Sequence, residues 1–90
     1  MHYKITLSKK YKQGYKKANK QDRLLIDEVV RKLANDEILE KKYKDHALIG
    51  SYIGFRECHI KPDLLLIYRK NENTLELYLA TLGNHNNNTF

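Results

Sequence analysis

Hydrophobic and polar residues alternate at the start of the chain, where Tyr3, Ile5 and Leu7 are separated by His2, Lys4 and Thr6. This period of two predicts a short strand over residues 2–7. From Tyr52 onward β-branched and aromatic residues dominate, and turn signals at residues 61–63 and 71–73 interrupt them. We therefore expect further strands near 52–60, 64–70 and 74–82. Their connections are short, which favours antiparallel neighbours. The polar tail from Gly83 is expected to begin with a turn.

Between the first strand and the later ones, hydrophobic residues recur with the spacing of two successive helices. Ser8 is a suitable N-cap for the first helix, in which Tyr11, Tyr15 and Ala18 recur at spacings of four and three. Asn19 is a suitable N-cap for the second, which we expect to run to about Leu39. Its buried face is expected to contain Leu25 or Ile26, Val29, Val30, Leu33 and Ala34. The pattern predicts an α+β fold, with an N-terminal strand, a two-helix hairpin and antiparallel strands forming one small sheet, with both helices on one face.

The strand alternation also assigns faces within the sheet. Cys58 shares a face with Arg56 and Ile60, whereas His59 shares the other with Glu57. In the last strand Leu75, Leu77, Leu79 and Thr81 are expected on one face, and Glu76, Tyr78, Ala80 and Leu82 on the other.

Length and composition narrow the class of protein. Ninety residues, 41% of them hydrophobic, can form one small core, so we expect residues 1–90 to be a single domain. The longest apolar run is the five residues from Leu64 to Tyr68, which is too short to span a membrane. No secretory signal is visible, and the single cysteine, Cys58, cannot form an internal disulfide. These features favour a cytoplasmic location.

The positive charge is concentrated near the N-terminus. Residues 1–20 carry seven lysines and no acidic residue, whereas the remaining residues carry ten basic and eleven acidic side chains. A cationic helix interleaved with tyrosines favours a surface that contacts nucleic-acid phosphates, and its candidate residues are Lys9, Lys10, Lys12 and Lys16. A helix that is simply solvated, an acidic protein partner and an anionic membrane surface are the alternatives.

Three histidines and one aspartate are the candidate catalytic residues: His46, His59, Asp63 and His85. Histidine titrates near neutral pH, so such groups can act as base and acid in RNA cleavage without a metal. Arg56 or a lysine can stabilise charge on the phosphate, and Phe90 can stack on a base. Metal-ligand spacings such as CxxC are absent, so we expect no metal and no cofactor. Cys58, in the middle of a strand, is expected to be inert.

Two stretches carry a family resemblance: Tyr43-Lys44-Asp45-His46-Ala47-Leu48-Ile49-Gly50, and the segment from Gly54 to Tyr68 that contains Arg56-Glu57-Cys58-His59-Ile60-Lys61-Pro62-Asp63. With Leu82-Gly83-Asn84-His85 and the terminal Phe90, they resemble the YafQ branch of the RelE-type toxins, in the RelE/ParE superfamily of type II toxin–antitoxin systems.

The resemblance implies a compact α+β toxin that cleaves mRNA in association with the ribosome, without a metal, and that an antitoxin neutralises. Operator DNA would be bound only by the toxin–antitoxin complex, and no membrane partner is expected. His46, His59, Asp63, His85 and Phe90 match functional positions of the family, with His85 as general acid and His59 or His46 as base. The family commonly has arginine at the position of Thr81, so Arg56 or a lysine would have to supply that cation. A translation blocker that binds RNA or the ribosome without cleaving it is the alternative, and a gyrase-directed toxin is a weaker one.

Overall fold

The computed structural model describes residues 2–84, and its elements follow the expected order. Strand β1 (Lys4–Leu7) precedes helices α1 (Lys9–Lys17) and α2 (Lys20–Ala34). The short strand β2 (His46–Ala47) lies between two single-turn 3₁₀ helices, η1 (Lys41–Tyr43) and η2 (Gly50–Tyr52). Strands β3 (Arg56–Lys61), β4 (Leu64–Asn71) and β5 (Glu76–Asn84) complete one five-stranded sheet of order β1-β5-β4-β3-β2. The α+β architecture expected from the sequence is confirmed.

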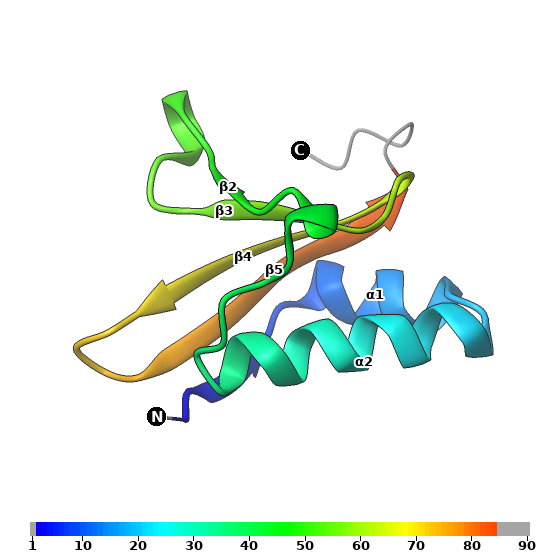
Figure 1. Cartoon of the computed structure of the whole chain (residues 1–90), viewed down its shortest axis with the longest axis horizontal. Helices are drawn as coiled ribbons and strands as arrows, with labels where there is room; N and C mark the ends of the chain where they lie inside the picture. The colour runs from blue at the N-terminus through cyan, green and yellow to red at the C-terminus, as the bar shows by residue number, and fades with distance from the viewer. Residues whose placement is uncertain (1, 85–90) are drawn as a thin grey trace.

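The sheet is mixed rather than wholly antiparallel. Strands β2 to β5 pair antiparallel, as expected, but β1 runs parallel to β5, with Lys4 opposite Glu76 and Leu7 opposite Leu79. The two helices return the chain across one face of the sheet before β2, so β1 is free to pair with the last strand (Figure 1). Local turn signals cannot predict this pairing, because its two strands lie at opposite ends of the sequence.

Three predicted boundaries were wrong. Helix α2 ends at Ala34 rather than near Leu39, because Asn35 caps it and Asp36 takes a left-handed φ of 60°. Residues 50–52 form η2, so the strand expected from 52 begins only at Arg56. Strand β5 continues to Asn84 instead of turning at Gly83, because both residues pair with the start of β4. The rest of the tail, residues 85–90, lies outside the described residues.

The core lies between the helices and one face of the sheet. Helix α2 contributes Ile26, Val29, Val30 and Leu33, and β3 contributes Cys58 and Ile60. Of the two residues left open for this helix, Ile26 is buried and Leu25 is 42% exposed. No helix among residues 2–84 is long and apolar enough to cross a membrane.

Helix α1 is held against β5 by its cap and by a glycine. The Ser8 hydroxyl accepts a hydrogen bond from the backbone N–H of Tyr11 at 3.0 Å and donates one to the carbonyl of Ala80. One and a half turns further along, Gly14 faces the backbone of Leu82. A Cβ atom on Gly14 would lie 1.9 Å from the Leu82 carbonyl oxygen. The helix therefore approaches the strand more closely than any other residue at position 14 would allow.

A β-bulge reverses the face assignment at the end of β5. Ile67 pairs with Thr81 but the next residue, Tyr68, pairs with Leu79, which leaves Ala80 as an extra residue in β5. Leu82 consequently joins Leu77 and Leu79 in the core, and Thr81 takes the face of Ile67. The expected grouping of Thr81 with Leu77 and Leu79 was therefore wrong.

We predict that Gly14→Ala destabilises the protein by about 1–3 kcal/mol, because the added methyl group forces α1 away from β5. Helix propensity alone predicts the opposite sign, a gain of about 1 kcal/mol. Urea denaturation of the variant, with the exposed Lys12→Ala as a control in the same helix, distinguishes the two. A gain in stability would show that the close approach of α1 to β5 has no energetic weight.

Candidate active site

His46 and His59 lie together on the face of the sheet that the helices leave uncovered. The pairing of β2 with β3 places His46 opposite Glu57, and His59 follows two residues later on the same face. The centroids of the two imidazole rings are 6.5 Å apart. The strands thus bring together two of the three histidines that the sequence singled out.

Both ring nitrogens of His46 face oxygen atoms. Nδ1 lies 2.7 Å from the carbonyl of Lys44, which can only accept, and Nε2 lies 3.3 Å from Oε1 of Glu57. Both oxygens are hydrogen-bond acceptors, so these two contacts fix the orientation of the ring. The Glu57 side chain is only 15% exposed, whereas that of His46 is 49% exposed. The Lys44 carbonyl and Glu57 therefore orient the ring of His46, while about half of its side chain is exposed to solvent.

The ring of His59 has no hydrogen bond or ion pair with another residue in the 2–84 range. It lies in β3 between Cys58 and Ile60, both of which are buried in the core, and is itself half-buried. The strand therefore fixes the backbone of His59, while no contact among those residues occupies its nitrogens.

A polar cluster on the opposite face of β3 supports the segment that carries His46. The carboxylate of Asp45 accepts a hydrogen bond from the Tyr68 hydroxyl at 2.6 Å and two from Arg56 at 3.3 Å. Burial and the bond to Asp45 raise the pKa of Tyr68 well above its usual value, so this hydroxyl stays a donor. The bond to Asp45 also raises the pKa of Arg56. These contacts attach the chain next to His46 to the core.

Arg56 is therefore not brought to the histidine pair. Its position in β3 directs it to the face of Tyr68, and its guanidinium pairs with Asp45. Asp63 lies exposed in the turn between β3 and β4, and no hydrogen bond or ion pair joins it to a histidine within residues 2–84. His85 and Phe90 lie outside the described residues. Asn84, the residue before His85, pairs with Leu64, which follows that turn.

The four predicted lysines differ in position. All are exposed, but only Lys10 faces the cleft between α1 and the end of β5, together with Lys17, which the sequence analysis did not select. Lys9, Lys12 and Lys16 lie on other sides of the helix. The helical period could have identified Lys17 from the sequence, because Lys10 and Lys17 are seven positions apart and therefore share a face of the helix.

Glu57 and Asp45 were also missed as members of the site. The strand alternation had already placed Glu57 on the face of His59, but the contact with His46 required the register of β2, a strand of only two residues. Asp45 precedes His46 directly, and its partner Tyr68 is 23 residues away in sequence.

Two further findings concern the thiol and metal ligands among the described residues. Cys58 is buried, and burial raises the pKa of its thiol to about 12, so it stays a neutral thiol at physiological pH. Within residues 2–84, no three histidine, cysteine or acidic side chains are grouped so as to hold a metal ion.

The chain is similar to known proteins along nearly its whole length. The sequence model of a family described as "Bacterial toxin of type II toxin-antitoxin system, YafQ" matches residues 3–88. The mRNA interferase toxin YafQ of Escherichia coli K12 is 35% identical over 74 residues, which cover 79% of this chain and 80% of that protein.

Solved structures agree in fold. The toxin chain in the E. coli DinJ–YafQ toxin–antitoxin complex superposes with a TM-score of 0.85 at 30% identity, covering 100% of both chains. A metal-bound toxin from Helicobacter pylori superposes with a TM-score of 0.82 at 39% identity, covering 98% of this chain and 99% of the other.

We predict that Asp45→Ala lowers the free energy of unfolding by about 1–3 kcal/mol, because the buried Tyr68 hydroxyl loses its acceptor. Asp45→Asn keeps an oxygen for that hydroxyl and should lose less. Urea denaturation of both variants measures the difference. Equal losses would mean that the hydrogen bond from Tyr68 does not contribute.

Proposed function

Because the chain belongs to the YafQ family of bacterial toxins from type II toxin–antitoxin systems, we propose that it is an endoribonuclease that cleaves mRNA. The observation that carries this proposal is the pair formed by His46 and His59 on one open face, with Glu57 behind it. Two imidazoles at this separation can act on the same ribose–phosphate unit, and acid–base cleavage of RNA needs no metal.

The proposed reaction is attack of the ribose 2′-oxygen on the adjacent phosphorus. A base removes the 2′-hydroxyl proton, the new P–O bond forms, and the bond to the 5′-oxygen breaks as an acid protonates that oxygen. The products are a 2′,3′-cyclic phosphate and a free 5′-hydroxyl. Negative charge accumulates on the phosphate oxygens in between, so a nearby cation lowers the barrier.

Of the two histidines, we assign the base to His59 and a positioning contact with the phosphate to His46. A base needs an unoccupied nitrogen, and the ring of His59 is free of hydrogen bonds to the rest of residues 2–84. Both ring nitrogens of His46 face oxygen atoms that orient the ring, and its exposed edge is left to face the phosphate. Glu57 is then a positioning residue for His46.

The remaining predicted residues keep proposed roles. His85 is the general acid, Phe90 stacks on a base, and Asp63 either orients a histidine or shares the role of base; all three positions match functional positions of the family. Lys9, Lys10, Lys12 and Lys16 contact RNA phosphates. For Arg56 we propose a positioning role through Asp45 in place of the expected contact with phosphate, because its guanidinium is held on the other face.

The proposed partners follow from the family. They are a cognate antitoxin, as in the DinJ–YafQ complex, and mRNA on the ribosome, with operator DNA bound only by the toxin–antitoxin complex. A protein that acts on translated mRNA would work in the cytoplasm.

We predict that His46→Ala and His59→Ala each slow RNA cleavage by roughly 10²-fold or more, the usual contribution of a group that transfers a proton or stabilises charge in the transition state. His85→Ala should do the same. His2→Ala is the matched control, because His2 is an exposed histidine before β1, and it should keep the native rate. Single-turnover cleavage of a defined transcript with EDTA present measures all four.

The other hypotheses make different predictions for the same variants. If the protein blocks translation by occupancy, the His59→Ala variant still arrests growth and no cut transcript is seen with the native chain. If the protein acted on gyrase, the native chain would inhibit supercoiling. Loss of cleavage on adding EDTA would overturn the metal-independent mechanism, a point given weight by the metal-bound relative from H. pylori.

A further inference from the structure

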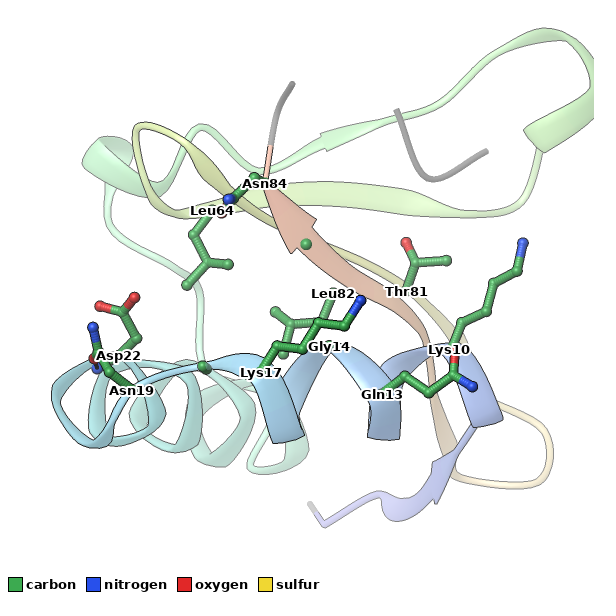
Figure 2. Close-up of a pocket in the computed structure, with 12 residues that line it drawn as sticks. Lys10, Gln13, Gly14, Lys17, Asn19, Asp22, Leu64, Thr81, Leu82 and Asn84 are labelled. Carbon is green, nitrogen blue, oxygen red and sulfur yellow. Dashed lines mark hydrogen bonds between the residues drawn. The ribbon is translucent and has the colours of Figure 1, made fainter. Parts of the chain in front are cut away.

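A cleft lies beside the histidine face, between α1 and the end of β5 (Figure 2). It has a volume of about 440 Å³. Strand β1 covers the edge of β5 only as far as Leu79, so Thr81 to Asn84 have no strand partner on that side within residues 2–84. The close approach of Gly14 to Leu82 sets the floor of the cleft.

Two lysine amines face this cleft without a carboxylate partner. Lys10 and Lys17 extend over it from α1, with Thr81 between them in the view of Figure 2. No ion pair or hydrogen bond connects either amine to another residue from 2 to 84. Asp22 also lines the cleft, but its carboxylate pairs with Lys61 at 3.1 Å. The cleft therefore has unneutralised positive charge, and Gln13 adds an uncharged hydrogen-bond donor.

Rows of paired residues across the sheet connect the histidine pair to the cleft. One row of paired residues runs His46, Glu57, Ile67 and Thr81, and the next runs His59, Leu65 and Gly83. Thr81 and Gly83 line the cleft and lie two strands from β3, a distance of about 10 Å at the usual strand spacing. A single strand of RNA whose scissile phosphate lies at His46 and His59 would pass its neighbouring phosphates over this cleft.

We propose that Lys10 and Lys17 bind two backbone phosphates of single-stranded RNA that flank the cleavage position. Their separation of seven positions spans about 10 Å along the helix axis, so each amine is placed for a phosphate of its own. An acidic segment of a protein partner is the competing occupant. RNA is favoured because the cleft continues the rows that contain His46 and His59. The proposal rests on the proposed RNA substrate and adds the path of the strand.

The test compares two double variants that lose the same charge. Lys10→Gln/Lys17→Gln removes the cleft amines, and Lys4→Gln/Lys20→Gln removes two exposed amines that lie outside both the cleft and the set of lysines proposed to contact RNA. The binding probe is a short 2′-O-methyl oligoribonucleotide, which cannot be cleaved, titrated from about 50 mM to about 200 mM salt. Each lost phosphate contact on a single strand lowers the log–log salt slope by about 0.7, so we expect the cleft variant to lose about 1.4 and the control clearly less.

The outcomes separate this proposal from the nuclease mechanism. Equal slopes for both double variants would overturn the cleft as a phosphate site, whatever the rate of cleavage. Failure of His59→Ala to slow cleavage would overturn the mechanism and leave the slope difference standing. If only the cleft variant loses affinity for a glutamate-rich peptide while its RNA slope stays native, the cleft is a protein-binding site. Circular dichroism of both variants shows that the exposed substitutions leave the fold intact.

Discussion

The attachment of α1 to β5 is the contact on which the geometry of both functional surfaces depends. Ser8 caps the helix and, through the same hydroxyl, bonds to the carbonyl of the bulged residue Ala80. Gly14 then brings the helix against Leu82 without an intervening side chain. The bulge turns Leu82 inward and Thr81 onto the histidine face. The same contact thus completes the core and sets the lysines of α1 beside the end of β5.

Because successive side chains of β3 point to opposite faces of the sheet, two different groups of polar residues lie on its two sides. On the helix side, Asp45, Arg56 and Tyr68 satisfy one another, and removing one partner leaves a buried donor or acceptor unpaired. On the open side, Nε2 of His46 contacts Glu57, and the His46 side chain stays about half-exposed. The parity of its position in this strand therefore decides which of the two polar groups a charged residue joins. Arg56 and Glu57, adjacent in sequence, lie in different groups.

Sequence patterns predicted the features that depend on local period and composition. Ser8 and Asn19 cap the two helices, and the alternation around Cys58 assigned His59 and Glu57 to one face. The patterns failed where a contact between residues far apart in the sequence determines the structure. The parallel pairing of β1 with β5 joins the two ends of the chain, and the bulge at Ala80 depends on the register with β4. Leu39, the expected end of the second helix, is buried but lies in a loop, because Asp36 ends the regular backbone first. The contact of His46 with Glu57 required a two-residue strand that no propensity marks.

The two surfaces should respond differently to solution conditions, because their charges differ in exposure. The lysines of α1 are exposed, and at physiological ionic strength the attraction between exposed charges is screened beyond about 8 Å. Under the proposal above, salt therefore weakens capture of the RNA strand. The Glu57 side chain is only 15% exposed, so the contact between His46 and Glu57 is less open to screening by salt than the lysines of α1 are. Thr81, between the two surfaces, carries no charge and cannot link them electrostatically. In the proposed mechanism, binding by the lysines of α1 and chemistry at the histidine pair can consequently be varied independently.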